Sequence, residues 1–271
     1  ERRKPLILQG ARQVGKTYSI LEFGRTYYEN VAYFNFETNP KLNETFEENI
    51  SPDYLIPILS HIAGQTIVRG KTLIVFDEVQ LCERALTSLK YFCEDAPEYH
   101  IIVAGSLLGV AVNRARFSFP VGKVDMKTLY PMDMEEFMLA MGEDALVEQI
   151  KKCFAADTPL PSALHDAAMQ LYRQYLIVGG MPECVTQFAE TKDYILVRHT
   201  QDTILASYLN DMSKYNNLNE IKKTRFTYDN ITVQLSKKNT RFQYKLIKKG
   251  GRASEFENAI EWLCLSGIVS Q

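Results

Sequence analysis

The sequence predicts an α/β fold in which a mainly parallel β-sheet with flanking helices is followed by a helical region. Up to about residue 129, short apolar runs alternate with helical patterns, which is typical of βαβ units. Beyond that point helical periodicity dominates, up to about residue 215. The chain has 271 residues, 46% of them hydrophobic, which is enough for one large domain or two modest ones.

Five apolar runs are predicted to form the strands, at residues 6–8, 31–36, 73–76, 101–103 and 124–129. The third run is the most apolar, so we expect it to be central and buried on both faces. A helix over residues 52–62 is predicted between the strands, because Ser51 can cap it and Pro52 suits its first position. Another helix is predicted over residues 84–93.

Helices are predicted throughout the second half of the chain. Asp133 begins one, with Glu136 at the capping-box position. Ser162 is expected to cap a helix that runs to residue 178, and others are predicted from Pro182 and over residues 193–212. From Glu220 we expect two helices, a short strand-like wing at 241–246 and a helix over 254–265. These elements predict three parts, which are an α/β core (1–132), a helical lid (133–213) and a winged-helix-like region (214–271).

A glycine-containing segment follows directly after the first predicted strand. It fits the phosphate-binding pattern G-x-x-x-x-G-K-[ST] and precedes a helix, as that pattern requires: Gly10-Ala11-Arg12-Gln13-Val14-Gly15-Lys16-Thr17. The glycines let backbone N–H groups turn inward, and the N–H groups that begin the helix point to the same place. Lys16 supplies a positive charge for the β- and γ-phosphates, and the Thr17 hydroxyl is a ligand for Mg²⁺. Together with Tyr18, these residues predict a site for a nucleoside triphosphate.

Two carboxylates follow the third predicted strand and complete a Walker B element, Leu73-Ile74-Val75-Phe76-Asp77-Glu78. In an open parallel sheet, ligands lie outside the carboxyl ends of the strands. We therefore expect Asp77 to join Thr17 in the magnesium shell. Glu78 is then placed to polarise the attacking water as a general base. A helix cap or a surface ion pair is the other interpretation of these two acids.

Three further candidates depend on how the chain is arranged. Ser106 follows the fourth predicted strand and would lie beside the γ-phosphate if that strand lies between the first and third. Otherwise it is a turn residue. Arg114 and Arg116 would stabilise transition-state charge if they reached a neighbouring subunit's site in a homo-oligomer, and would otherwise be surface arginines. The alternatives for that role are Arg69, Arg173 and Arg198.

Composition favours a cytoplasmic protein without a membrane span. The five cysteines are scattered and form no metal-binding spacing, which is typical of buried thiols in a reducing compartment. The longest uncharged apolar run, residues 101–112, is too short to cross a bilayer, which takes roughly twenty residues. The chain opens at Glu1, without Met and almost on the first strand, so we expect the natural N-terminus to lie upstream.

Charge is distributed unevenly along the chain, although the net charge is only −2. Residues 214–271 hold eleven basic and five acidic residues, a net charge of +6, whereas the remainder holds 20 and 28, a net charge of −8. This asymmetry indicates either nucleic acid, such as DNA, or another acidic partner for the C-terminal region; an ordinary solvated surface is the alternative.

Several segments resemble a prokaryotic family of ATPases in the AAA+ superfamily. In the first half they are the phosphate-loop motif, Tyr33-Phe34-Asn35-Phe36-Glu37, Phe76-Asp77-Glu78-Val79-Gln80, Ala104-Gly105-Ser106-Leu107-Leu108-Gly109, Phe119-Pro120-Val121-Gly122-Lys123-Val124 and Leu129-Tyr130-Pro131-Met132. Gly179-Gly180-Met181-Pro182 and residues 255–269 are similar to the family's second half, a domain of unknown function.

This resemblance implies an AAA-type ATPase core followed by a helical lid and a winged-helix region, with ATP and Mg²⁺ as cofactors. It also identifies Ser106 with the sensor position of these enzymes. Many members end in a restriction-endonuclease-like domain, and no nuclease activity is assigned to this chain.

The sequence therefore predicts an ATP hydrolase that couples nucleotide state to its C-terminal domain. A slow nucleotide-gated switch that binds DNA or a protein partner is the alternative, with the lysines of the C-terminal region meeting phosphates (Lys222, Lys223, Lys237, Lys238, Lys248 and Lys249). A small-molecule kinase is disfavoured, because Glu78 favours hydrolysis and no second substrate motif is visible.

Overall fold

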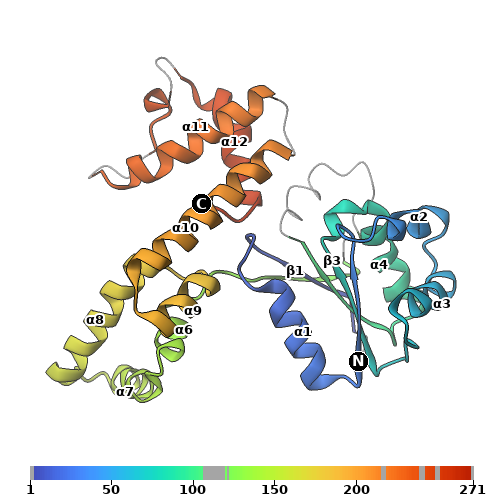
Figure 1. The fold of residues 1–271 in the computed structure, drawn as a ribbon, viewed down its shortest axis with the longest axis horizontal. Coiled ribbons are helices and arrows are strands. Elements are labelled where there is room, and N and C mark those ends of the chain that lie inside the picture. Colours follow the sequence, from blue (N-terminus) through green and yellow to red (C-terminus); the bar gives the residue numbers. More distant parts are fainter. Residues whose placement is uncertain are drawn as a thin grey trace. The chain divides into compact units, whose positions relative to one another are not determined.

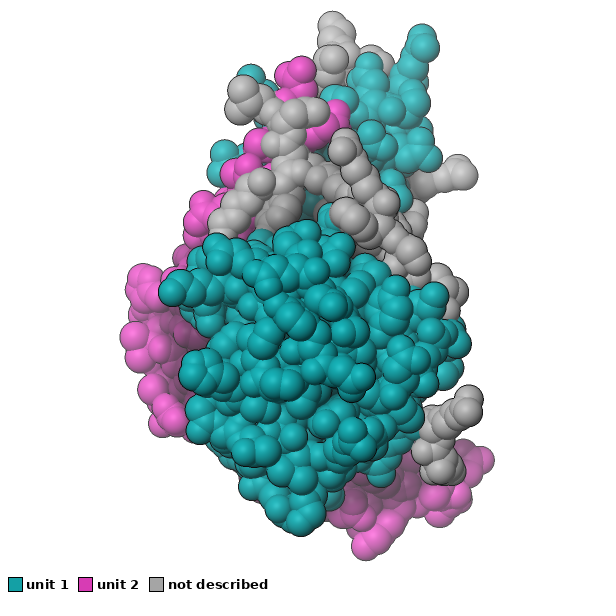
Figure 2. Space-filling view, turned by 90° about the vertical axis from the view of Figure 1, so that its right-hand side faces the viewer, with its two compact units in different colours: residues 1–129, 222–271 teal, residues 130–221 magenta. Residues whose placement is uncertain are grey.

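The structure of the chain is a computed structural model that describes residues 3–105, 120, 122–214, 218–237, 242–247 and 251–269. It divides into two compact units, which Figure 2 colours separately. Unit 1 contains residues 1–129 and 222–271, and unit 2 contains residues 130–221. The division into core, lid and winged-helix-like region stays a prediction.

Residues 6–128 of unit 1 contain a five-stranded parallel sheet. Its strands have the order β2-β3-β4-β1-β5 and the bounds Leu6–Gln9 (β1), Asn30–Asn35 (β2), Thr72–Asp77 (β3), His100–Ala104 (β4) and Asp125–Thr128 (β5). All five lie within two residues of the apolar runs that predicted them. The fourth strand lies between the first and the third, as the interpretation of Ser106 requires.

Helices cover both faces of this sheet (Figure 1). One face carries α1 (Lys16–Tyr27). The other carries α2 (Lys41–Glu48), α3 (Pro52–Ala63) and α4 (Glu83–Asp95), the last preceded by the 3₁₀ helix η1 (Val79–Leu81).

Side-chain alternation along β3 explains why the whole strand is buried. Leu73 and Val75 pack toward α1, whereas Ile74 and Phe76 pack into the larger core on the opposite face. Since successive side chains of a strand alternate between faces, Asp77 projects to the α1 face with Leu73 and Val75. The register therefore directs the Asp77 carboxylate toward the start of α1.

Unit 2 consists of helices. They are α6 (Met134–Ala140), α7 (Asp144–Ala155), α8 (Ser162–Val178), α9 (Pro182–Thr191), α10 (Tyr194–Lys214) and the start of α11 (Leu218–Leu235). The predicted capping box is confirmed, because the Asp133 side chain accepts from the Glu136 N–H and the Glu136 carboxylate accepts from the Asp133 N–H. The expected cap at Ser162 is wrong by one residue, since Pro161 occupies the cap position and Ser162 begins the helix.

The described C-terminal residues differ from the predicted elements in two respects. The single helix α11 stands where two helices were expected, because residues 218–235 contain no glycine or proline to interrupt it. At the expected wing, residues 244–246 form the 3₁₀ helix η2 (Tyr244–Leu246) ahead of α12 (Ala253–Leu265). The winged-helix character of this region stays a prediction.

Within the described part of the chain, no helix is both long enough and apolar enough to span a membrane.

Candidate nucleotide-binding site

The glycine-rich segment forms a tight loop between β1 and α1. Gly10, Gln13 and Gly15 have φ angles of 144°, 66° and 92°, a region of backbone space that glycine enters without steric cost. A Cβ atom added to Gly10 would lie 2.1 Å from the carbonyl oxygen of Leu129. The loop therefore needs glycine at position 10 both for its backbone angle and for this close approach.

Lys16 is buried at the start of α1, with 8% of the residue exposed. Its Nζ donates to the carbonyl oxygens of Gly10 and Ala11, at 2.9 and 2.7 Å. Burial lowers the pKa of Lys16 to about 8, and the nearby carboxylates of Glu78 and Asp77 act in the opposite direction. A buried ammonium held by carbonyl groups is suited to exchange them for a phosphate.

The Asp77 carboxylate accepts three hydrogen bonds at the carboxyl end of β3. Its Oδ2 atom accepts from the Thr17 hydroxyl at 2.8 Å and from the Tyr33 hydroxyl at 2.7 Å. Its Oδ1 atom accepts from the backbone N–H of Glu78 at 2.9 Å. The carboxylate is thus held beside the hydroxyl of Thr17, and hydroxyl and carboxylate oxygens are the ligand types that Mg²⁺ prefers.

Glu78 adopts a left-handed backbone conformation, with φ 52° and ψ 38°. Burial raises the pKa of its carboxyl above the ordinary value, and the charge of Asp77 acts in the same direction. A hydrogen bond that Gln80 donates to Oε2 of Glu78 lowers that pKa in part. A half-buried carboxylate with a raised pKa is a stronger base than an exposed one.

The remaining predicted residues are only partly accounted for. Ser106, Arg114 and Arg116 lie outside the described residues, as do Lys238, Lys248 and Lys249. Tyr18 follows Thr17 on α1 with 72% of the residue exposed. Arg12 lies in the loop, where its charge acts on Lys16.

The rival arginines are divided between the two units. Arg69 precedes β3, at the amino end of the sheet, where it pairs with Glu98 at 3.1 Å. The phosphate loop lies at the carboxyl ends of the strands, so this position argues against a role of Arg69 beside the phosphate loop of its own chain. Arg198 pairs with Asp202 at 3.1 Å on α10, and Arg173 is exposed on α8.

Three side chains near Asp77 and Glu78 were not predicted as functional. Tyr33 contacts Asp77, Asn35 donates to the Tyr33 hydroxyl at 3.2 Å, and Gln80 contacts Glu78. Alternation of polar and apolar residues in β2 places Tyr33 and Asn35 on one face, opposite Ala32 and Phe34. That alternation was visible in the sequence, but the pairing of β2 with β3 was not.

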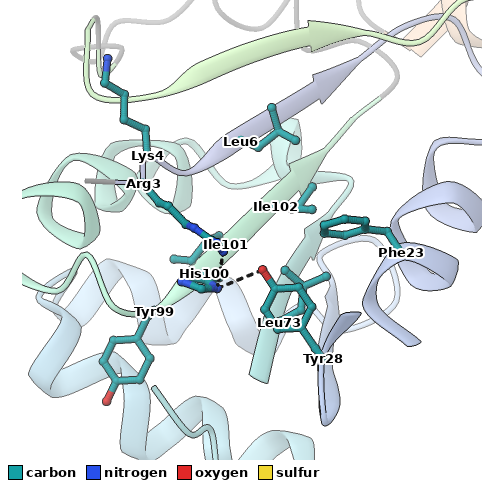
Figure 3. Close-up of a pocket in the computed structure, with 10 residues that line it drawn as sticks. All are labelled: Arg3, Lys4, Leu6, Phe23, Tyr28, Leu73, Tyr99, His100, Ile101 and Ile102. Carbon is teal, nitrogen blue, oxygen red and sulfur yellow. Dashed lines mark hydrogen bonds between the residues drawn. The ribbon is translucent and has the colours of Figure 1, made fainter. Parts of the chain in front are cut away.

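A pocket of about 150 Å³ lies at the amino ends of the strands of the sheet (Figure 3). Leu6, Leu73 and Ile102 contribute apolar side chains, and Phe23 approaches from α1. Polar groups also line this pocket. The Nδ1 atom of His100 lies 3.0 Å from the Tyr28 hydroxyl and 3.4 Å from a nitrogen of Arg3. It is separate from the phosphate loop, which lies at the carboxyl ends.

Comparison with known structures supports the fold. The Walker-type ATPase PABY2304 of Pyrococcus abyssi superimposes with a TM-score of 0.53 and 13% sequence identity, over 97% of this chain and 85% of that one. ORC2 of Aeropyrum pernix has a TM-score of 0.43 with 12% identity, over 99% and 81% of the two chains. The RuvB Holliday junction branch migration motor of Thermotoga maritima has a TM-score of 0.40 with 12% identity, over 100% and 83%. These identities support a shared fold only, and the last two scores are too low to carry an argument.

Comparison of the sequence with curated proteins finds no match. Two family profiles do match the chain. Residues 169–271 match a domain of unknown function, DUF8612, and residues 2–138, half of the chain, match a family described as AAA domain. The match to the AAA domain includes the phosphate loop, the parallel sheet and the two carboxylates at the end of β3. The chain therefore belongs to the AAA domain family and has the fold of an AAA+ P-loop ATPase.

Proposed function

We propose that this protein binds ATP with Mg²⁺ and hydrolyses it at the carboxyl edge of the sheet in unit 1. The single observation that carries this proposal is the hydrogen bond between Thr17 and Asp77, at 2.8 Å. It joins the phosphate loop to the end of β3, so that a hydroxyl and a carboxylate lie together beside the Lys16 ammonium.

The donor atoms fit a magnesium ion that is bound together with a nucleotide. Thr17 and Asp77 would hold the ion, which when bound neutralises phosphate charge. No group of three or more His, Cys, Asp or Glu side chains able to hold a metal is found among the described residues. Mg²⁺ commonly binds to one or two protein groups and completes its shell with phosphates and waters, and Thr17 and Asp77 provide two such groups.

The residues of the chain divide the remaining work. The N–H groups of the loop and of the first turn of α1 bind phosphate oxygens. Lys16 leaves the carbonyls of Gly10 and Ala11 and pairs with the β- and γ-phosphates. The Glu78 carboxylate accepts a proton from the water that attacks the γ-phosphorus.

Steady-state ATP hydrolysis tests this proposal, measured with Mg²⁺ and with EDTA in its place. We expect turnover only when Mg²⁺ is present. If neither turnover nor nucleotide binding is detected in either condition, the proposal is refuted. Duplex DNA is added in a parallel series because the region from residue 214 carries a net charge of +6. Stimulation that weakens steeply with salt would support DNA as a partner of that region.

A second function, a slow nucleotide-gated switch, is favoured by the hydrogen bond between Gln80 and Glu78. This bond occupies one oxygen of the proposed base, so turnover would require Gln80 to release it. Tight ATP binding with negligible turnover in the wild type would support the switch. The substitution Gln80→Ala should then increase turnover. We also propose that a second subunit of a homo-oligomer supplies an arginine that stabilises the transition-state charge. Turnover per protein molecule that rises with protein concentration would indicate such an arginine.

A further inference from the structure

One oxygen of Asp77 accepts hydrogen bonds from two different elements. Thr17 reaches Oδ2 from the start of α1, at 2.8 Å, and Tyr33 reaches the same atom from β2, at 2.7 Å. In the proposed function Thr17 is itself a ligand of the ion. The hydroxyl of Tyr33 therefore fixes the carboxylate that in turn orients this ligand.

The register of the sheet explains how Tyr33 reaches Asp77. In the parallel pair β2–β3, Tyr33 lies opposite Val75 and Asn35 lies opposite Asp77. Val31 and Val75 both pack toward α1, so alternation along each strand places Tyr33 and Asp77 on that same face. Diagonal neighbours on one face of a sheet are about 7–8 Å apart, a distance that a tyrosine side chain spans.

Tyr33 is itself held by the end of β2. The Nδ2 atom of Asn35 donates to the Tyr33 hydroxyl at 3.2 Å. The Oδ1 atom of Asn35 accepts from the N–H groups of Glu37 and Thr38, at 2.9 and 3.0 Å. A continuous series of hydrogen bonds therefore runs from the turn after β2 to the Asp77 carboxylate.

We propose that Tyr33 is a positioning residue of the magnesium–nucleotide site, holding Asp77 in the orientation in which it accepts from Thr17. This inference rests on the proposed function. Residues that hydrogen-bond to the ligands of a metal orient those ligands, and their loss commonly weakens metal binding by about 10- to 100-fold.

The alternative is that the Tyr33 hydroxyl only stabilises the fold, and its position gives such a role a small effect. β2 is an edge strand of the sheet, and 38% of Tyr33 is exposed. A single hydrogen bond at such a position contributes only about 1 kcal/mol to stability. Phenylalanine would keep the ring and its contacts, so the substitution Tyr33→Phe removes the hydroxyl alone.

The test measures how much Mg²⁺ improves the binding of a non-hydrolysable ATP analogue. Isothermal titration calorimetry gives the dissociation constant of the analogue in EDTA and in saturating Mg²⁺, for wild type and Tyr33→Phe. We expect the improvement by Mg²⁺ to fall about tenfold in Tyr33→Phe. The dissociation constant in EDTA should not change, because Lys16 and the loop amides remain intact.

Tyr27→Phe is the matched control. It removes a hydroxyl from a residue that is 71% exposed near the end of α1, and it should leave both dissociation constants unchanged. Thermal unfolding of all three proteins checks that the fold is retained. If Mg²⁺ improves binding equally in wild type and Tyr33→Phe, the role of Tyr33 is refuted while the proposed function stands. If wild type does not bind the analogue at all, both fail together.

Discussion

The two ends of the strands in unit 1 have opposite chemical character. At the carboxyl ends, Lys16 and Thr17 begin α1, and they donate hydrogen bonds to the phosphate loop and to Asp77. At the amino ends, Leu6, Leu73 and Ile102 line a hollow near the end of α1. The N-terminus of a helix attracts anions and its C-terminus repels them. The direction of α1 therefore favours phosphate at the first end only, although Arg3 and Lys4 lie at the second.

This contrast predicts that removing the carboxylate of Glu78 has the largest effect on turnover. In Glu78→Gln we expect ATP hydrolysis to fall on the order of 10²–10⁴-fold while ATP binding is retained, because only the proton acceptor is lost. Glu29→Gln is the control at the amino ends, where Glu29 pairs with Lys71 at 2.8 Å. Unchanged turnover in Glu78→Gln would transfer the role of base to another residue.

Two lysines at opposite ends of the sheet test the contrast through binding. Lys16→Ala should weaken ATP binding about 100-fold, since charge-assisted hydrogen bonds to phosphate are lost. Lys4→Ala, which removes an exposed lysine at the amino ends, should leave affinity unchanged. Calorimetric titration with ATP measures both. Normal affinity in Lys16→Ala would show that the loop is not the phosphate site.

Substitutions of two glycines test whether the backbone of the phosphate loop is more constrained than the backbone at the amino ends of the strands. Alanine at position 10 would place its Cβ 2.1 Å from the Leu129 carbonyl, whereas alanine at position 70, before β3, would meet nothing within 4 Å. We expect Gly10→Ala to lower the free energy of unfolding by about 3 kcal/mol. Gly70→Ala should lower it by about 1 kcal/mol, from its φ of 66° alone. Chemical denaturation would contradict this if the two losses were equal.

The smallest expected effect concerns His100 at the amino ends. Burial lowers the pKa of His100 below its ordinary value of 6.5, and the charge of Arg3 adds to this. The unfolded chain therefore takes up a proton at higher pH than the folded chain, so stability is lost as pH falls from about 6.5 toward the lower folded pKa. In His100→Gln, denaturation midpoints between pH 7 and pH 5 should depend less on pH than in wild type. An identical pH dependence would show that His100 is not responsible.

The sequence was informative where a single segment determines the structure. The five apolar runs predicted the strands closely, and the phosphate loop and the end of β3 were recognised because each motif is contiguous. The role of Tyr33 could not be predicted in this way. It depends on β2 lying beside β3 in a register that sets Asn35 opposite Asp77, and strand pairing joins residues more than forty positions apart. The single helix α11 was missed although residues 218–235 contain no glycine or proline to divide it. The 3₁₀ helix at Tyr244–Leu246 was missed because alternation over a few residues is a weak signal for a strand.

The left-handed backbone of Glu78 has a consequence for how this protein would respond to selection. A non-glycine residue in that conformation costs roughly 1–2 kcal/mol, whereas glycine adopts it without this cost. A library at position 78 that is selected for thermal resistance alone should therefore enrich glycine. The same library selected for ATP turnover should retain glutamate. If Glu78 acts as the proposed base, stability and activity would thus favour different residues at position 78, and the backbone strain there would serve the proposed chemistry.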